Sequence, residues 1–267
     1  MELSPEACPS VSVLDRAMAI LGAYGRDDAA LPLHELRRRT GLARATVYRL
    51  VVHLADLGLL EREGQNYRLG MRLFELGERV PRARELRRAA LPHLHELLEA
   101  TRANVHLGML EGLRVLYLER LTGRDHVPLP SVVGDFMPAH ATALGKVLLA
   151  FAPPGTVAAV LEAGLAPLTP YTITAPRLLI EQLVEIRRTG VGAEREESAV
   201  GLACVAAPVR LGDEVVAAVS VSYPIGRYDP RALSGPVRRT GDAISAELDR
   251  RRPATFAPAA RRQPVTA

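Results

Sequence analysis

The sequence is poor in the residues that build disulfide frameworks and metal sites. Its 267 residues include two cysteines, Cys8 and Cys204, which lie far apart in the chain. Two such cysteines predict neither a disulfide framework nor a metal cluster. Five histidines in the middle of the chain also lack ligand spacing with cysteines or acids: His93, His95, His106, His126 and His140. No metal and no cofactor is therefore expected.

Long apolar runs and the signatures of common enzyme classes are absent as well. No run reaches the ~18 uninterrupted apolar residues of a membrane-spanning helix. The start, "MELSPEACPS", has an acid and a proline in place of the apolar core of a signal peptide. The motifs HExxH, GxSxG and GxGxxG and a Walker loop do not occur. With 48% hydrophobic residues, the sequence predicts a globular cytoplasmic protein that has no membrane partner and is not an enzyme.

Lysine is almost missing too, because 33 of the 34 basic residues are arginine and the remaining one is Lys146. Such a bias can reflect the base composition of the gene, so arginine enrichment alone is weak evidence for a polyanionic partner. The position of the charge says more. From Leu33 to Arg72 eight arginines stand against four acids, and from Arg79 to Arg88 five arginines stand against one glutamate. A basic front joined to a more acidic body indicates a nucleic-acid-binding module, with an ordinary solvated helical surface as the alternative.

Residues 10–74 have the pattern of a winged helix-turn-helix domain, preceded by a disordered lead at residues 1–9. A first helix is predicted after an N-cap at Ser12, with apolar residues on one face: Val13, Ala17, Ile20 and Leu21. A second short helix ends at Gly41, where the tight turn requires a permissive residue. The third, from Ala43 to Leu57, carries an apolar stripe: Val47, Leu50, Val51, Leu54 and Leu57. Two short extended pieces around a Gly-Gln-Asn turn form the wing.

The outward face of the third helix is expected to read DNA, because the first turns of a recognition helix reach base edges in the major groove. This face presents Arg44, Ala45, Thr46, Tyr48 and Arg49. Arginine can pair with guanine, while threonine and tyrosine suit phosphates or thymine methyl groups. In the wing, Arg62 and Arg68 suit the flanking backbone or the minor groove. The alternative is a winged helix used for protein contacts. Ala43 stands at the N-cap, where Ser, Thr, Asp or Asn would stabilise the helix by about 1 kcal/mol.

After the wing, residues 75–90 are interpreted as a linker helix and residues 91–252 as a second domain of the α+β class. Pro81 and Pro92 are expected to interrupt the helical stretch. Two β-hairpins are predicted in the second domain, turning at Glu111-Gly112 and at Gly212-Asp213, with several helices around them. Residues 253–267 are expected to form a disordered tail.

Four segments in this order resemble the IclR family of bacterial transcription regulators, over nearly the whole chain from Val11 to Arg250. They are "SVLDRAMAIL", "GLARATVYRLVVHLADLGLLER" with "YRLG", "PAHATALGKVLLA", and "EESAVGLACVAAPV" with "VVAAVSVSYP". The resemblance implies an N-terminal winged helix, a linker helix for dimerisation and a C-terminal GAF-like domain that binds a small effector, often a carboxylate. It also implies a homodimer or a dimer of dimers on double-stranded operator DNA, associated with the nucleoid.

The segment "HATALGK" is interpreted as a polar turn that leads into an apolar helix, whose N-terminal amides suit an anion. The resemblance assigns Ala143 and Leu144 to the effector site, with Leu144 bulkier than its counterpart in the family. The alternative is a simple helix cap with Lys146 in solvent. By the same resemblance, Glu194 takes a position at the edge of the pocket that often carries Asp.

Three further candidates lie on predicted strands. The resemblance places a pocket cysteine at Cys204, for which an inert core cysteine is the alternative. Ser220 and Ser222 alternate with valines, so both hydroxyls point to one face of the strand. Hydroxyls that share a face with a cysteine are suitable donors to a carboxylate. The alternative is a pair of serines on a strand that faces solvent.

The sequence therefore predicts a DNA-binding transcription regulator that is controlled by a small organic-acid effector. Two alternatives remain open. One is a non-specific architectural DNA binder whose second domain is only structural. The other is a GAF-like-domain enzyme that uses Cys204.

Overall fold

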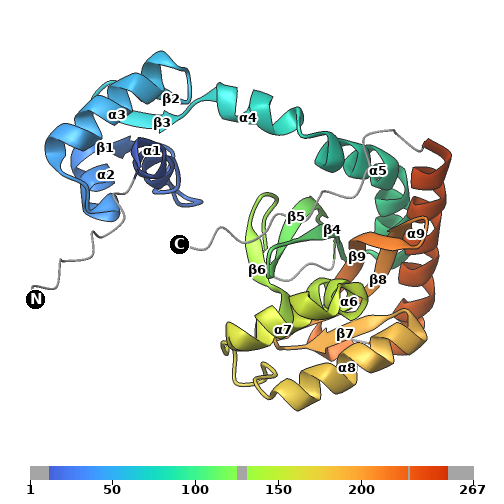
Figure 1. Ribbon diagram of the computed structural model, residues 1–267. Coiled ribbons are helices and arrows are strands. Elements are labelled where there is room, and N and C mark those ends of the chain that lie inside the picture. The colour runs from blue at the N-terminus through green and yellow to red at the C-terminus, as the bar shows by residue number, and fades with distance from the viewer. Residues whose placement is uncertain (1–11, 125–130, 228, 252–267) are drawn as a thin grey trace, which may run out of the picture. The chain divides into compact units, whose positions relative to one another are not determined.

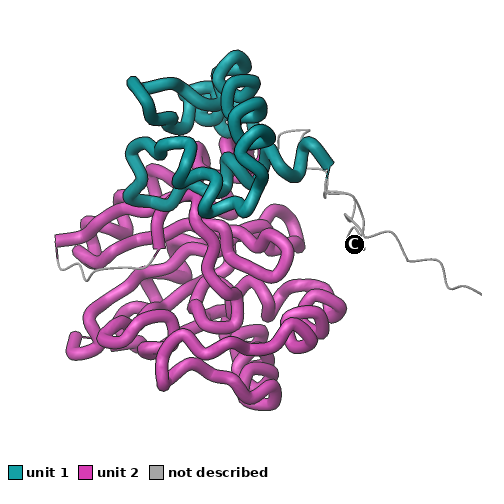
Figure 2. The backbone as a smooth tube through the Cα atoms, turned by 90° about the vertical axis from the view of Figure 1, so that its left-hand side faces the viewer, with its two compact units in different colours: residues 1–80 teal, residues 81–267 magenta. Residues whose placement is uncertain are grey.

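The computed structural model describes residues 12–124, 131–227 and 229–251. The chain divides into two compact units, residues 1–80 and residues 81–267, which Figure 2 draws in teal and magenta. The expected disordered lead at residues 1–9, the expected tail at residues 253–267 and His126 lie outside the described residues. No helix among those that the structure describes is both long enough and apolar enough to cross a bilayer.

The N-terminal unit is a winged helix-turn-helix, as predicted (Figure 1). Its elements are α1 Val13–Leu21, β1 Leu31–Pro32, α2 Leu33–Thr40, α3 Arg44–Asp56, β2 Leu60–Glu63 and β3 Asn66–Leu69. Ser12 caps α1 in a reciprocal pair with Asp15, and Gly41 ends α2 in the left-handed conformation with φ 67°. The three strands form one antiparallel sheet in the order β1-β3-β2. These local signals explain where α1 begins and where α2 ends.

The core of this unit forms where the three helices meet the small sheet. Its buried side chains are Ile20, Leu31, Leu36, Val47, Val51, Leu54, Leu60 and Tyr67. Two residues expected on the buried faces are exposed instead, namely Val13 and Leu57. Only the C-terminal half of α1 packs against the core, so Val13 in its first turn stays outside. Leu57 is the C-cap of α3, because the helix ends one residue earlier than predicted.

Two helices link the wing to the second sheet: α4 Met71–Glu78 and α5 Pro81–Thr101. The chain does change helix at Pro81, which begins α5, where a proline costs no hydrogen bond. The expectation that Pro92 interrupts the stretch is wrong, because α5 continues through it. Burial of Leu86, Ala89, Ala90 and Leu94 on both sides of Pro92 compensates for the missing backbone bond. The expected linker at residues 75–90 therefore spans two helices, and the boundary after residue 90 falls inside α5.

The C-terminal unit is built on one six-stranded antiparallel sheet in the order β6-β5-β4-β9-β8-β7. The strands are β4 Asn104–Glu111, β5 Arg114–Leu121, β6 Phe136–Pro138, β7 Gly192–Arg195, β8 Leu202–Leu211 and β9 Glu214–Pro224. Both predicted hairpins are present. The first turns one residue later than predicted, since Glu111 itself pairs with Arg114. The edge strands β6 and β7 were not predicted.

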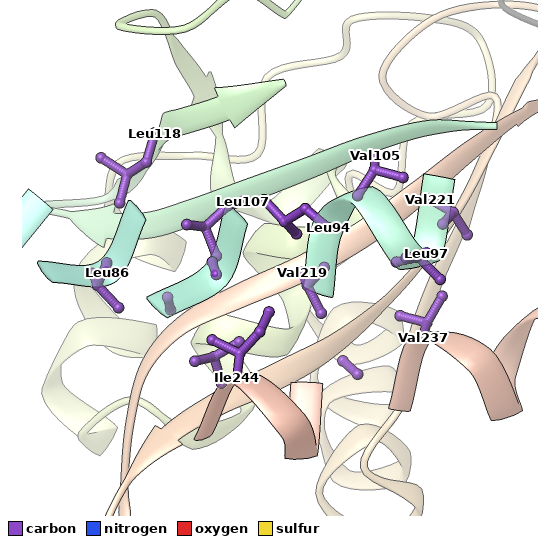
Figure 3. Packing of buried hydrophobic residues seen from close by; sticks show 14 of the residues in the cluster. Leu86, Leu94, Leu97, Val105, Leu107, Leu118, Val219, Val221, Val237 and Ile244 are labelled. Carbon is purple, nitrogen blue, oxygen red and sulfur yellow. The ribbon is translucent and has the colours of Figure 1, made fainter. Parts of the chain in front are cut away.

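Helices cover both faces of this sheet, which confirms the α+β class (Figure 1). They are α6 Ala143–Phe151, α7 Pro154–Glu162, α8 Pro176–Thr189 and α9 Pro230–Arg251. On one face α5 and α9 pack against β4 and β9, where Leu94 and Ile244 meet Leu107 and Val219 (Figure 3). On the other face α6 and α8 enclose a second apolar core. The unit thus has a separate core on each side of the sheet.

Two glycines let α6 lie unusually close to its neighbours. A Cβ at Gly145 would stand 2.2 Å from the carbonyl oxygen of Ala139, and a Cβ at Gly192 would stand 2.7 Å from Cγ2 of Val147. Both distances are shorter than real contacts of this kind. The missing side chain of Gly192 therefore lets α6 lie against β7, and that of Gly145 lets α6 lie against Ala139 in the turn before it.

Candidate functional site

The DNA-reading face predicted on α3 lies on the outside of the N-terminal unit. Arg44, Ala45, Tyr48 and Arg49 are exposed and Thr46 is half-buried, while Val47 and Val51 hold the opposite face of the helix in the core. Both wing arginines are exposed as well. The seven residues chosen from the sequence are thus accessible to a duplex, and their contacts with DNA stay a prediction.

The N-terminus of α3 has no side-chain cap. Ala43 occupies the N-cap, as predicted, and its carbonyl oxygen accepts the N–H groups of Thr46 at 2.9 Å and Val47 at 3.0 Å. Among the described residues, the N–H groups of Arg44 and Ala45 have no hydrogen-bond partner. Free amides at a helix N-terminus attract anions such as phosphate.

The candidate DNA-binding arginines differ in whether they already have a partner in the protein. Within the described part of the chain, Arg44 and Arg49 have no ion-pair or hydrogen-bond partner. In the wing, Arg68 binds Glu61 with Nη2 2.8 Å from Oε2, and Nε of Arg62 donates to the carbonyl oxygen of Gly64 at 2.9 Å. Helix α3 therefore presents two arginines that no described group holds, whereas Arg68 of the wing is held by a carboxylate.

A row of polar side chains crosses the sheet of the C-terminal unit on the α6 side. Asn104 on β4 stands opposite Ser222 on β9, Ser222 opposite Cys204 on β8, and Cys204 opposite Glu194 on β7. Alternate residues of a strand share a face. His106 and Ser220, which are also paired across strands, therefore form the next row on that face.

Apart from Asn104, the residues of these rows line the floor of a small cavity, and the N-terminus of α6 lies over it. The cavity is lined by all six effector-site candidates: Ala143, Leu144, Glu194, Cys204, Ser220 and Ser222. Thr142 caps α6, with its side chain accepting the N–H of Gly145 at 3.0 Å. The structure thus brings together the candidates from the loop and the three strands, and their contact with an effector stays a prediction.

Two of the alternatives that the sequence left open are excluded. Ser220 and Ser222 are 3% and 2% exposed, so they do not face solvent. Lys146 is fully buried and forms an ion pair with Glu197, with Nζ 2.5 Å from Oε1. Burial lowers the pKa of Lys146, and the nearby carboxylates act against that shift.

Sequence reasoning missed several residues of the cavity wall, among them His106, Tyr117, Ser131 and Ser198. They lie on elements whose contact with α6 no local pattern reveals. It also missed Glu197, the partner of Lys146. One feature of the sequence points to a buried ion pair: Lys146 is the single lysine of the chain and lies in a helix that is otherwise apolar.

Glu194 is held in the cavity by hydrogen bonds from the loop that follows β7. Its Oε2 accepts the N–H of Glu197 at 2.9 Å, and its Oε1 accepts the hydroxyl of Ser198 at 3.1 Å. Burial raises the pKa of Glu194, while hydrogen bonds from Cys204, Glu197 and Ser198 act in the opposite direction. The loop itself is fixed by Thr172, whose hydroxyl donates to the carbonyl oxygen of Glu197 at 2.7 Å.

Two further titratable groups of the cavity are neutral. Burial and then the carboxylate of Glu194 raise the pKa of Cys204, whose Sγ lies 3.1 Å from Oγ of Ser222. A nucleophilic cysteine needs a lowered pKa, so this environment gives no support to the enzyme alternative. Burial, followed by the charge of Arg120, lowers the pKa of His106 to about 3. No three His, Cys, Asp or Glu side chains gather as a metal site in the part of the chain that the structure describes.

Comparison with known proteins gives concordant matches for both units. The family model described as "Bacterial transcriptional regulator IclR C-terminal" matches residues 79–246, and "IclR helix-turn-helix domain" matches residues 13–64. The HTH-type transcriptional regulator XynR of Escherichia coli K12 is 32% identical over 247 residues, which is 90% of this chain and 98% of XynR. KdgR of the same strain is 34% identical over 247 residues, 90% of this chain and 93% of KdgR. A solved IclR homolog from Microbacterium hydrocarbonoxydans, complexed with 4-hydroxybenzoate, has a TM-score of 0.84 and 32% identity, covering 89% of this chain and 99% of that one.

Proposed function

Because the chain belongs to the IclR family of bacterial transcriptional regulators, it is a DNA-binding transcription regulator with an effector-binding domain. We propose that a small organic acid bound in the cavity of the C-terminal unit controls its affinity for operator DNA. The observation that carries this proposal is the cavity, in which two buried serines and the first turn of α6 converge. The solved relative that is 32% identical is complexed with 4-hydroxybenzoate, itself a small organic acid.

The residues of the cavity suit different parts of such a ligand. At the start of α6 the N–H groups of Ala143 and Leu144 have no hydrogen-bond partner among the described residues. These N–H groups and the hydroxyls of Ser220 and Ser222 are donors that suit a carboxylate. Ala143, Leu144 and Cys204 would set the shape of the space beside it, and Glu194 would flank its polar end. Leu144 is a bulky residue at this position and would restrict the size of the effector.

In the N-terminal unit we assign sequence reading to the exposed face of α3. Arg44, Ala45, Thr46, Tyr48 and Arg49 would enter the major groove, where arginine pairs with guanine. The wing residues Arg62 and Arg68 would contact the flanking backbone. Operator binding of this kind would keep the protein at the nucleoid.

The active form is proposed to be a homodimer or a dimer of dimers. Large apolar side chains are exposed on two helices of the N-terminal unit: Leu14 and Met18 on α1, Met71 and Phe74 on α4. Leu14 and Met18 are four residues apart on α1 and Met71 and Phe74 three apart on α4, so each pair lies on one face of its helix, as at protein–protein contacts. A second copy would cover them and set the spacing between two recognition helices. An effector that prefers one of two conformations would then shift that spacing and the operator affinity together.

The DNA-binding assignment is tested by removing the two free arginines of α3. Arg44→Ala and Arg49→Ala should each weaken specific operator binding by about 1–3 kcal/mol without changing thermal stability. A gel shift with competitor DNA, over a salt series, measures the loss. Arg177→Ala, at an exposed arginine of α8, is the matched control and should bind as the wild type does.

Two outcomes would contradict the assignment. Wild-type operator affinity in both α3 variants would remove the recognition helix from base reading. Binding that is equally strong on competitor DNA, with a steep salt dependence, would favour the non-specific architectural binder. For the effector, a thermal-shift screen of small carboxylates that includes 4-hydroxybenzoate should find one that stabilises the protein and changes operator affinity.

A further inference from the structure

The cavity places a buried acid beside the site proposed for an acidic ligand. Glu194 is 2% exposed and lines the cavity, and no lysine or arginine lines it among the described residues. Two carboxylates in one buried site cannot both be ionised without a large cost. Either one of them holds a proton, or a cation compensates their charge.

The buried cation near the cavity, Lys146, forms its ion pair with Glu197 and not with Glu194. Nζ of Lys146 lies 2.5 Å from Oε1 of Glu197, and both side chains are buried. The cluster therefore contains two carboxyl groups, Glu194 and Glu197, for one ammonium group. The partners of Glu194 are the backbone N–H of Glu197, the hydroxyl of Ser198 and the thiol of Cys204, which are all neutral donors. Glu194 is thus the carboxyl group without a cation of its own.

The hydrogen bonds of Glu194 indicate where a proton would reside. A backbone N–H can only donate, so Oε2, which is 2.9 Å from the N–H of Glu197, must remain an acceptor. Oε1 is 3.1 Å from the hydroxyl of Ser198, and a hydroxyl can either donate or accept. Oε1 can therefore be protonated while Ser198 turns its own hydrogen to another acceptor.

We propose that Glu194 takes up a proton from solvent as a carboxylate enters the cavity, and donates a hydrogen bond from Oε1 to that carboxylate. Glu194 then acts as a specificity-determining residue, because it admits an anion only in its neutral form. This inference rests on the proposed function, since it assumes that the effector is a carboxylate.

The other titratable groups around Glu194 are poor candidates for this proton. They are His106 on β4, Tyr117 on β5, His140 before α6, Lys146 on α6, Glu197 in the loop after β7 and Cys204 on β8. Burial lowers the pKa of His106 to about 3 and also lowers the pKa of His140. Burial raises the pKa of Tyr117 and of Cys204, so both are already protonated. Glu197 forms the ion pair with Lys146, whereas burial raises the pKa of Glu194.

A first measurement needs no ligand. A group whose pKa is higher in the folded than in the unfolded chain stabilises the fold at low pH, and this contribution is lost as pH rises through the folded pKa. Gln has no such proton to lose, so Glu194→Gln avoids this loss of stability. The melting temperature of the variant minus that of wild type should therefore be higher at about pH 8 than at about pH 5. The matched control, Glu197→Gln, leaves Lys146 without a counterion and should lower the melting temperature at both pH values. A Glu194→Gln variant that falls further below wild type at the higher pH would overturn the proposal, because ionised Glu194 would then be the stabilised form.

The second measurement uses 4-hydroxybenzoate and acetate as probes. Calorimetry near neutral pH, in phosphate and in Tris, compares buffers that differ in ionisation enthalpy and so counts the protons taken up on binding. Wild type should take up as much as about one proton for each carboxylate bound, and Glu194→Gln should bind without uptake. Equal uptake in the two proteins would place the proton elsewhere and overturn the proposal. If neither probe binds wild type, the proposed carboxylate effector fails, while the stability measurement still decides the protonation of Glu194.

Discussion

At the scale of single residues, Lys146 stands out because its ammonium group is buried, whereas an ammonium group is most stable in water. It is fully buried, and its ion-pair partner Glu197 comes from a loop 51 residues further along the chain. Removing two charges from water is costly unless they remain together. The free-energy cost of burying either charge therefore depends on the presence of the other.

This dependence predicts an asymmetry between single and double variants. Lys146→Met should lower the free energy of unfolding by about 3–5 kcal/mol, because it leaves a buried carboxylate unpaired. Lys146→Met combined with Glu197→Leu should return to within about 1 kcal/mol of wild type, since an apolar pair of similar volume avoids the cost of burying charge. Urea denaturation at neutral pH measures both. A double variant as unstable as the single one would show that the pair does more than neutralise its own charges.

Single residues also show where sequence reasoning stops. Ser220 and Ser222 alternate with valines, so strand geometry alone predicts that they share a face, and the structure has them in one cavity. The burial of Lys146 depends on Glu197, whose proximity follows from the packing of α6 on the sheet and from no local pattern. The same holds for His106 and Tyr117, which reach the cavity from β4 and β5. The functional roles of the cavity residues and of the α3 face remain predictions.

At the scale of elements, the N-terminus of α3 is a helix end that no side chain caps. Ala43 provides no side-chain acceptor, and the amides of Arg44 and Ala45 are free among the described residues. A DNA phosphate could bind there and supply the missing acceptor. Local stability and DNA affinity would then compete for the same backbone groups.

Ala43→Ser should separate the two properties. The serine hydroxyl would cap the helix and stabilise the DNA-binding unit by about 1 kcal/mol, while weakening operator binding because one free amide is then occupied. Chemical denaturation and a gel shift measure the two effects. Ala55→Ser, near the C-terminal end of α3, is the control and should not stabilise the unit. A gain in both stability and operator affinity for Ala43→Ser would contradict a phosphate site at this helix end.

The elements differ in how well the sequence predicts them. The α3 stripe and the two long hairpins span enough residues to show a clear period, and the structure has them within one residue of their predicted positions. The strands β6 and β7 have three and four residues, too few for a pattern, and exist because a neighbouring strand offers hydrogen bonds. The predicted break at Pro92 is wrong because burial of the apolar side chains before and after it outweighs the backbone hydrogen bond that proline cannot make.

At the scale of the whole molecule, the effector and the operator bind different units of one chain. Any influence between two such sites is reciprocal: if a carboxylate changes operator affinity by a given factor, the operator changes carboxylate affinity by the same factor. We expect a factor of about 5–150. Operator titration by fluorescence anisotropy, with and without 4-hydroxybenzoate, gives one value, and calorimetry with and without operator gives the other. Unequal factors would mean that a further equilibrium, such as a change in the number of subunits, takes part.

The helix α5 connects the two units of the chain, so a change at the cavity could reach the DNA-binding unit through it. Its 21 residues make a rod about 30 Å long, and its first residue, Pro81, directly follows Val80, the last residue of the DNA-binding unit. At the far end, the hydroxyl of Tyr223, next to the cavity serine Ser222, donates to the carbonyl oxygen of Thr101 at 2.5 Å. Because Leu86, Leu94 and Leu97 are buried against the sheet, α5 is held along its length. A shift of β4, whose other face carries His106 into the cavity, would therefore move the whole helix and Pro81 with it.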